Sequence, residues 1–229
     1  MYLYIVSECQ SLNMWARRSC GNAGKEGLTL EHFLKSTEII DWDHPSVLAK
    51  AEELSKGSAD AQQTARRCFE WVRDEIQHSF DFKRNPVTCR ASEVLAAKTG
   101  YCYAKSHLLA ALLRANAIPA GLCYQRLSID DTGAPLSLHG LNAIHLPSFG
   151  WYRVDCRGNK VGVEARFTPP VERLAFRIMF SEERNFPQIL TDPLPVVVTA
   201  LRTYRTWDDL YKHLPDWTES SLPDCPLSV

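Results

Sequence analysis

The spacing of apolar residues predicts two helices in the first third of the chain. Over residues 45–56 the apolar positions recur at helical intervals, and Gly57 follows as a stop signal. A stronger helix is predicted over residues 61–77, where apolar residues recur at steps of three and four. Asp60 stands just before it and Gln63 three residues later, which resembles the capping box of a helix start.

A further helical pattern begins at Cys102 and stops near Asn116. A shorter helix over residues 92–98 precedes it and ends before Gly100. The pattern after Cys102 is apolar around most of the helix circumference, which is typical of a helix that is buried rather than lying on a surface. The sequence therefore predicts a buried helix with a cysteine in its first turn.

After this helix the period of the pattern becomes strand-like. Residues 121–129 alternate, and two further strands are predicted over residues 138–146 and 151–156. Residues 196–201 fit either a strand or the start of a helix, and a short helix is predicted over residues 207–213. Helices come first and an antiparallel sheet follows, so the predicted fold class is α+β.

The predicted organisation is one domain with an extension at each end. A length of 229 residues fits one large α+β domain. Residues 1–28 contain Ser, Asn and Gly clusters with weak periodicity, so we expect a poorly ordered N-terminal extension there. We place the domain at residues 29–215 and a C-terminal tail at residues 216–229.

Charge and the lengths of the apolar runs narrow the range of partners. Lysines and arginines number 26 and aspartates and glutamates 27, so the formal net charge is −1. A near-neutral balance lacks the excess of positive charge that is typical of proteins that bind nucleic acid or an anionic membrane surface. The longest apolar runs are too short to span a bilayer, and residues 1–6 do not resemble a secretory signal. We therefore expect a cytoplasmic protein that binds neither nucleic acid nor membrane.

Eight cysteines are scattered along the chain, and no two of them form a CxxC pair. The spacings of zinc knuckles and of thioredoxins are therefore missing, and no metal or other cofactor is expected. In a reducing compartment most of these thiols act as small apolar side chains. The question is which cysteine has a different role.

Cys102 is the cysteine best placed for nucleophilic chemistry. A helix N-terminus favours a thiolate, and its free backbone N–H groups can hold a developing oxyanion. Gly100 allows a sharp turn and leaves room for a substrate, and Lys105 adds positive charge one turn later. The alternative is an ordinary buried cysteine. Cys89, which precedes a short helix, is the main rival nucleophile.

A thiol nucleophile needs a base, and the base needs a group that orients it. His139 opens one predicted strand and Asp155 closes the next. A four-residue loop between these strands would put the two side chains on opposite faces. A loop of three or five residues, or a bulge, would make them diagonal neighbours. Asn142 is an alternative orienting residue, but its parity places it on the face opposite to His139.

Three aromatic residues are candidates for the lining of a substrate cleft, namely Tyr101, Tyr103 and Trp151. Packing in the core is the alternative for at least one of them. The histidines other than His139 are each less favoured as the base, although His78 ends the long helix and could reach a cleft.

Two segments resemble sequences of the transglutaminase-like superfamily. The first is the Gly-Tyr-Cys-Tyr-Ala-Lys motif at residues 100–105 with the helix that follows it, and the second spans residues 139–155 with its Gly-Trp pair. The resemblance covers roughly residues 60–170. It implies a papain-like core, in which the nucleophile helix packs on an antiparallel sheet that carries the histidine and the aspartate.

The same resemblance implies a catalytic triad of Cys102, His139 and Asp155. Members of the superfamily often carry tryptophan two residues after the histidine, where this chain has Leu141. The Arg-Gly-Asn-Lys stretch at residues 157–160 resembles a bacterial subgroup described only as "putative cysteine proteases". The calcium loops and extra domains of the animal cross-linking enzymes have no counterpart in this sequence. The resemblance therefore indicates the type of reaction more clearly than the identity of the substrate.

The sequence thus predicts a thiol enzyme that acts on a peptide or carboxamide bond through a thioester. Water would give hydrolysis, as in a protease or amidase, and an amine acceptor would give transfer. The expected acyl donor is a peptide or protein, and the oligomeric state is left open. A non-catalytic interaction module on the same fold is the alternative. A third hypothesis is a metal site formed by Cys102 and His139, for which a metal assay is expected to return zero.

Overall fold

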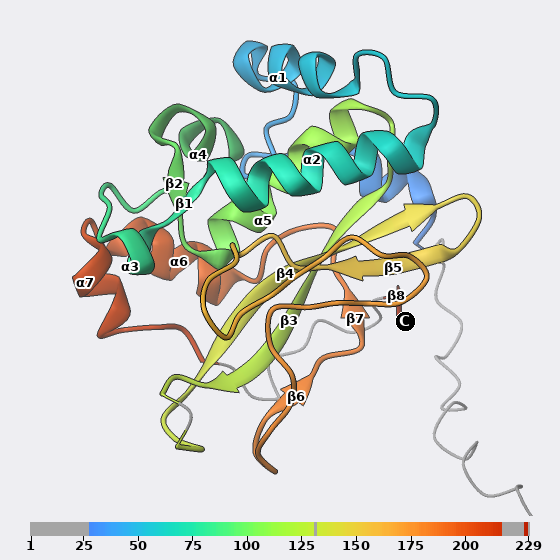
Figure 1. Cartoon of the computed structure of the whole chain (residues 1–229). Coiled ribbons are helices and arrows are strands. Elements are labelled where there is room, and N and C mark those ends of the chain that lie inside the picture. Colours follow the sequence, from blue (N-terminus) through green and yellow to red (C-terminus); the bar gives the residue numbers. More distant parts are fainter. Residues whose placement is uncertain (1–27, 131, 217–226, 229) are drawn as a thin grey trace, which may run out of the picture.

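The predicted α+β class is confirmed by the computed structural model, which describes residues 28–130, 132–216 and 227–228 (Figure 1). Its helices are η1 (Leu30–Leu34, a 3-10 helix), α1 (Pro45–Ser55), α2 (Ala61–Glu75), α3 (Ser79–Phe82), α4 (Ala91–Ala97), α5 (Cys102–Ala115), α6 (Pro195–Thr203) and α7 (Trp207–Tyr211). Its strands are β1 (Gln77–His78), β2 (Thr99–Gly100), β3 (Ala120–Ser128), β4 (Leu136–Leu146), β5 (Gly150–Val154), β6 (Arg184–Asn185), β7 (Gln188–Ile189) and β8 (Leu227–Ser228).

Helix α5 is the buried centre of the fold, as its all-round apolar pattern predicts. Each residue from Cys102 to Arg114 is buried. The helix packs against α1, α2 and α4 and, below them in Figure 1, against β3 and β4. It approaches the sheet closely because Gly140 on β4 has no side chain: a Cβ atom there would lie 3.0 Å from Cα of Tyr103. The first turn of α5 therefore lies directly on β4.

The strands β5, β4, β3 and β6 form an antiparallel sheet in that order. Leu146 on β4 lies opposite Gly150 on β5, which leaves a three-residue loop at residues 147–149. Gly150 has a φ of +72°, the left-handed conformation that follows the turn in many three-residue hairpin loops. The odd loop length needed to bring His139 and Asp155 to one face is therefore present.

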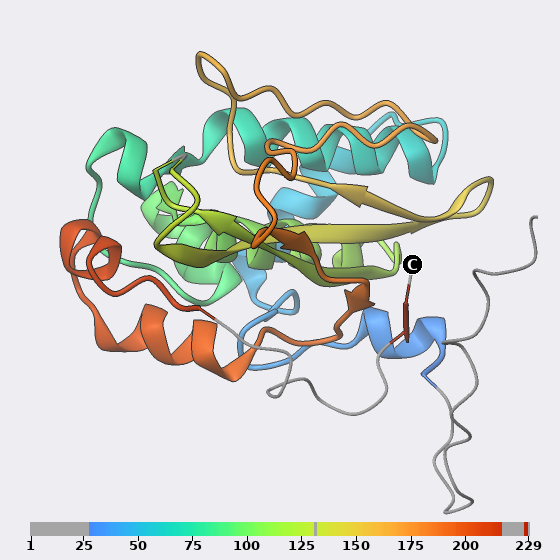
Figure 2. The same ribbon diagram turned by 90° about the horizontal axis from the view of Figure 1, so that it is seen from below.

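Between β5 and β6 the chain forms a long segment, residues 157–183, which we call the strap. It runs beside the sheet (Figure 2). Glu172 holds it to β5, because its Oε2 accepts a hydrogen bond from Nη2 of Arg153 at 2.8 Å. The ring of Phe176 lies at right angles to the imidazole of His139, with ring centroids 5.0 Å apart. The strap therefore covers the face of the sheet from which His139 projects.

The structure decides between the alternatives for one segment near the C-terminus and shows a strand in the predicted tail. The apolar run at residues 196–201 lies in α6, where Pro195 occupies a favoured position at the start of the helix. Part of the predicted tail, residues 216–229, joins the domain, because β8 pairs antiparallel with β7. The predicted extension, residues 1–28, lies outside the described residues apart from Leu28. Among the described residues, no helix is long and apolar enough to cross a membrane.

Candidate active site

Cys102 is the first residue of α5 and lines a cleft of about 1310 Å³. Its exposed fraction is 7%. Strand β2 leads into the helix and pairs in parallel with β1, which places His78 level with Gly100. At Gly100 a Cβ atom would lie 3.1 Å from Cβ of Ala104 and 3.2 Å from Oγ1 of Thr88, so a side chain there would need its neighbours to move. The tight entry to a buried helix that the sequence predicts is therefore present.

His139 and Asp155 are hydrogen-bonded to each other, with Nε2 of His139 2.7 Å from Oδ2 of Asp155. The register of β4 and β5 makes the two residues diagonal neighbours on one face. Strand β5 ends at Val154, opposite Asn142, whereas β4 extends further, to and beyond His139. The imidazole therefore lies where the sheet narrows, and it lines the same cleft as Cys102.

Asp155 is fully buried and accepts three hydrogen bonds. Besides the imidazole, the backbone N–H of Arg157 donates to Oδ1 and the backbone N–H of Ala175 donates to Oδ2, each at 3.1 Å. Burial alone would raise the pKa of this carboxyl group. The charge and hydrogen bond of His139, together with the two amides, instead hold the pKa below its usual value. Asp155 is therefore an anion at neutral pH, and Nε2 of the imidazole donates to it.

Cys102 interacts with the same imidazole. Burial would lower the pKa of His139, but the charges of Asp155 and Cys102, and hydrogen bonds with both groups, raise that pKa to about 10. His139 is therefore an imidazolium ion at neutral pH that interacts with Cys102 and with the carboxylate of Asp155. The structure brings together the three residues that the sequence analysis selected, and their catalytic role stays a prediction.

The other cysteines in the described part of the chain are poor nucleophiles, because burial disfavours their thiolates. Burial raises the pKa of Cys89 to about 11, and those of Cys68, Cys123 and Cys156 to about 12. Cys89, the main rival, is 4% exposed and is not part of the cleft wall around Cys102. Of the described cysteines, Cys102 alone combines a place on the cleft with an imidazole partner.

Two of the three aromatic candidates line the cleft. Tyr101 and Tyr103 lie on its wall, and their hydroxyl groups donate to backbone carbonyl groups. Trp151 does not, because its ring packs edge-on against Phe33, with centroids 4.8 Å apart, near the other end of the β4–β5 pair. The predicted place of Trp151 in the cleft lining therefore differs from the structure, in which Trp151 is partly buried against the smaller apolar cluster that contains Phe33.

Asn142, the alternative orienting residue, faces α5 instead of His139. Its Nδ2 donates to the backbone oxygen of Ser106 at 2.9 Å and to that of Gly121 at 3.2 Å. The contact joins the nucleophile helix to the sheet. Asp155 is thus the residue that contacts the imidazole, a pairing that the strand parity permits when the loop between β4 and β5 has an odd length.

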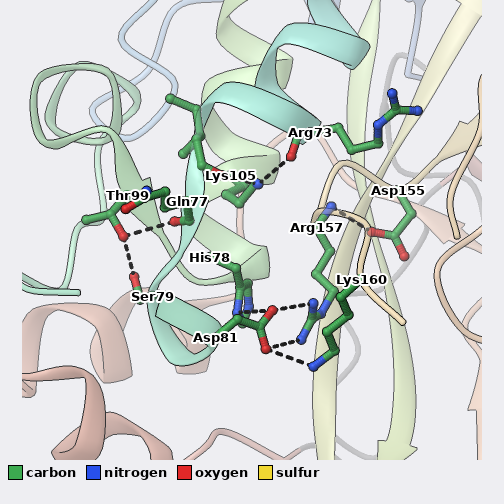
Figure 3. Close-up of polar contacts among 11 residues, drawn as sticks. Arg73, Gln77, His78, Ser79, Asp81, Thr99, Lys105, Asp155, Arg157 and Lys160 are labelled. Carbon is green, nitrogen blue, oxygen red and sulfur yellow. Dashed lines mark hydrogen bonds and ion pairs between the residues drawn. The ribbon is translucent and has the colours of Figure 1, made fainter. Parts of the chain in front are cut away.

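Lys105 forms hydrogen bonds that hold the fold together, whereas the sequence suggested that it adds positive charge near Cys102. Its Nζ donates to the backbone oxygens of Arg73 and Ile76 at the end of α2 (Figure 3). The side chain is fully buried, and burial lowers the pKa of the amine to about 8. Lys105 therefore caps α2 and fixes the chain that continues into β1.

His78 also lines the cleft, although the only sign of this in the sequence is its place at the end of the long predicted helix. It is 7% exposed, and its ring packs edge-on against Tyr101, with centroids 5.5 Å apart. Nδ1 lies 3.4 Å from Oδ2 of Asp81, but no hydrogen-bond partner exists for it within the described residues. Burial, and next the positive charge of Arg157, hold the pKa of His78 well below its usual value. The imidazole is therefore neutral at pH 7.

Asp81 ties α3 to the start of the strap. Its carboxylate forms ion pairs with Nη1 of Arg157 at 2.5 Å and with Nζ of Lys160 at 2.8 Å (Figure 3). The backbone N–H of Arg157 in turn donates to Asp155. Burial would raise the pKa of Asp81, but hydrogen bonds from Arg157 and Lys160 lower it to about 2. The tether connects the part of the cleft wall that carries His78 with the part that holds Asp155.

We expect Asp81→Asn to lower the free energy of unfolding by about 1–3 kcal/mol at pH 7, because the buried guanidinium of Arg157 loses its anion. The pKa of Asp81 is lowered by folding. The contribution of the Asp81 carboxylate to the free energy of unfolding is therefore full above the unfolded-state pKa of about 3.9. This contribution is lost as the pH falls towards about 2. Urea unfolding should show a constant difference between wild type and variant above about pH 5 and a shrinking one below about pH 4.

The exposed pair of Asp74 with Arg73 provides the control for this tether. Asp74→Asn is expected to change the free energy of unfolding by less than about 1 kcal/mol at any of these pH values. An Asp81→Asn difference that persists undiminished at about pH 2 would show that the loss arises from packing and not from the carboxylate charge.

A metal site of Cys102 and His139 was the third hypothesis from the sequence. No group of three or more His, Cys, Asp or Glu side chains that could hold a metal ion occurs in the part of the chain that the structure describes. Nε2 of His139 is already hydrogen-bonded to Asp155. A stoichiometric metal assay remains the test of this hypothesis.

A family model described as "Transglutaminase-like superfamily" matches residues 49–156. This range contains Cys102, His139 and Asp155. Comparison with curated proteins gives no match.

Similar solved structures share little sequence with the chain. One, described as "a Putative Cysteine Protease from Cytophaga hutchinsonii", is 17% identical with a TM-score of 0.46, over 56% of this chain and 42% of that one. Another, the periplasmic domain of TgpA from Pseudomonas aeruginosa, is 21% identical with a TM-score of 0.43, over 56% of this chain and 46% of that one. The similarity therefore covers less than half of the length of either structure.

Proposed function

We propose, since residues 49–156 match the family model of the transglutaminase-like superfamily, that this chain is a thiol enzyme with Cys102 as its nucleophile. The observation that carries the proposal is that one imidazole, His139, interacts with both Cys102 and the carboxylate of Asp155. An imidazolium ion beside a cysteine at a helix N-terminus favours the thiolate, which is the reactive form. The proposed reaction is acyl transfer at a peptide or carboxamide bond.

In this reaction the thiolate of Cys102 attacks the carbonyl carbon of the acyl donor. His139 donates its proton to the leaving amine, and the acyl group remains on Cys102 as a thioester. Neutral His139 then takes a proton from water or from an amine acceptor, which attacks the thioester and releases Cys102. Asp155 keeps the imidazole oriented throughout and stabilises its cationic form.

The developing oxyanion is proposed to be held by the backbone N–H of Cys102 and by His78. N–H groups in the first turn of a helix have no partner within the helix. His78 lies level with Gly100 across the β1–β2 pair, and its neutral ring carries one N–H that can be donated to an oxygen in the cleft. The two histidines thus differ in charge: the cation at 139 donates a proton, and the neutral ring at 78 donates a hydrogen bond.

Replacement of His78 by alanine is expected to lower kcat about 10²–10³-fold with p-nitrophenyl acetate, an activated acyl donor, because one oxyanion donor is lost. Alkylation of Cys102 by iodoacetamide forms no oxyanion, so its rate should change by less than about 3-fold. His78→Gln keeps an N–H donor and is expected to recover part of the kcat. Equal losses in acylation and alkylation would indicate a structural effect on Cys102 and would contradict the oxyanion role.

Mass spectrometry tests the acyl-transfer proposal as a whole. p-Nitrophenyl acetate should add an acetyl group to the peptide that contains Cys102, and the Cys102→Ala variant should show no such group at that position. A primary amine such as butylamine, added to the acetylated enzyme, would give an amide by transfer, whereas hydrolysis gives acetate only. The acyl group trapped on Cys102 in a cell extract would then identify the class of the natural donor.

The non-catalytic alternative is less favoured by the described residues. A module that only binds a partner has no need for a cysteine and an imidazolium on a cleft wall with a buried carboxylate hydrogen-bonded behind them. We also propose a cytoplasmic location, because the cysteines in the described part of the chain are free thiols. Free thiols persist in reducing compartments.

A further inference from the structure

Arginine and aromatic side chains that the proposed reaction does not use also line the cleft. The strap contributes Arg173 and Arg177, α3 contributes Phe80, and α7 contributes Tyr211. Phe80 and Tyr211 are stacked, with ring centroids 4.3 Å apart. The wall of the cleft thus offers both guanidinium groups and an aromatic surface to a ligand.

Arg173 and Arg177 are exposed, and neither has an acidic partner among the residues that the structure describes. The other basic side chains of the strap that line the cleft are already paired: Arg157 and Lys160 with Asp81, and Arg166 with Glu164. Two guanidinium groups therefore face the cleft region without a carboxylate of their own.

The glutamates of the cleft wall do not supply that carboxylate. Each has other partners: Glu172 has Arg153, Glu164 has Arg166, and Glu183 accepts backbone N–H groups of Ser128, Met179 and Phe180. Because a free guanidinium prefers a planar anion such as a carboxylate, the two arginines are suited to a ligand that brings carboxylates with it.

The two arginines flank the part of the strap that touches the proposed triad. Between them, the backbone N–H of Ala175 donates to Asp155, and the ring of Phe176 contacts the imidazole of His139. A carboxylate bound by either arginine is therefore at most two strap residues from a group that contacts the triad. This position suits a side chain close to the scissile bond.

We propose, resting on the acyl-transfer function above, that the acyl donor is an acidic peptide. Its carboxylate side chains bind Arg173 and Arg177, and its apolar side chains pack on Phe80 and Tyr211. The overall charge of the chain is close to neutral, so this preference is local to the cleft and does not extend to polyanions in general.

The test measures binding to the Cys102→Ser variant, so that the result does not depend on turnover. The probe is a fluorescein-labelled peptide of alternating glutamate and leucine, compared with the same peptide in which glutamine replaces each glutamate. The glutamate peptide is expected to bind more tightly, and added salt should reduce its advantage because exposed charges are screened. Adding Arg173→Gln and Arg177→Gln together should weaken binding of the glutamate peptide about 3- to 30-fold. The affinity for the glutamine peptide should stay nearly unchanged.

A matched control is Arg84→Gln with Arg205→Gln, which changes the net charge equally at two exposed arginines outside the cleft wall. Equal affinity for both peptides, or an equal loss in this control, would overturn the proposal. Tighter binding of a single-stranded DNA oligonucleotide of equal charge would also overturn it, in favour of a nucleic-acid partner. Failure of the acyl-transfer function would appear separately, as no acetylation of Cys102 by p-nitrophenyl acetate.

Discussion

Iodoacetamide is expected to alkylate Cys102 at pH 7 at least about 10²-fold faster than Cys89 or Cys123 in the folded protein. Burial raises the pKa of Cys89 to about 11 and that of Cys123 to about 12, so both are almost entirely thiols at this pH. Cys102 instead lines the cleft and interacts with an imidazolium ion. Rates at single cysteines are measured by peptide mapping at a series of times. The mapping also separates labels on Cys9, Cys20 and Cys225, which lie outside the described residues.

His139→Ala is expected to slow the alkylation of Cys102 by about 10- to 100-fold, because the thiolate loses its neighbouring cation. His145→Ala is the matched control, since His145 lies at the other end of β4 and contacts Trp151; there the rate should stay within about 2-fold. Labelling of Cys102 no faster than that of Cys123 would remove Cys102 as the nucleophile.

Cys102→Ala is expected to abolish acyl transfer altogether.

The elements around the site were predictable because their physical signals are local. The all-round apolar pattern of residues 102–115 has no stable place except inside the fold, so burial of α5 follows from sequence. The period change after Pro119 likewise predicts the antiparallel strands. Parity restricts His139 and Asp155 to one face only if the loop is odd, and Gly150 supplies the left-handed residue that a three-residue loop requires.

Other parts of the site depend on contacts between distant segments, which no local pattern contains. His78 belongs to the site because β1 pairs with β2, a pair of two-residue strands too short to leave a periodic signal. Arg173 and Arg177 reach the cleft because the strap folds back beside the sheet. The position of Trp151 could not be predicted for a different reason. In sequence, an aromatic residue on a strand fits a cleft wall or a core equally well, and here Trp151 packs against Phe33.

Asp155→Asn is expected to lower kcat/KM for p-nitrophenyl acetate by about 10²–10⁴-fold. The carboxylate accepts three N–H groups, from His139, Arg157 and Ala175. An amide has one oxygen, and its NH₂ group must then face at least one of these donors. If the NH₂ group faces His139, the imidazole must present Nε2 as an acceptor, so the ring is neutral and its one proton is on the other ring nitrogen. The nitrogen on the Cys102 side then cannot accept a proton, and the thiolate of Cys102 loses the cation that stabilises it.

Steady-state kinetics measures this loss, and NMR of the His139 ring measures its cause. The pKa of His139, raised to about 10 in the wild type in part by the charge of Asp155, should fall when that charge is removed. Glu172→Gln makes the same change from carboxylate to amide on the strap, where Glu172 bonds to Arg153, and is expected to alter kcat/KM by less than about 3-fold. A His139 pKa that is unchanged in Asp155→Asn would contradict the role of Asp155.

The same pair also makes stability depend on pH, and His139 adds an alkaline limb that the Asp81 tether lacks. Folding raises the pKa of His139, so its contribution to the free energy of unfolding is full below the unfolded-state pKa of about 6.5 and is lost as the pH rises through about 10. Folding lowers the pKa of Asp155, so the difference in unfolding free energy between wild type and Asp155→Asn should shrink both in acid and at alkaline pH, whereas that of Asp81→Asn shrinks only in acid. Because the two carboxylates are joined through Arg157, an alkaline decrease confined to Asp155→Asn would show that each carboxylate acts through its own charged partner and not through the connection between them.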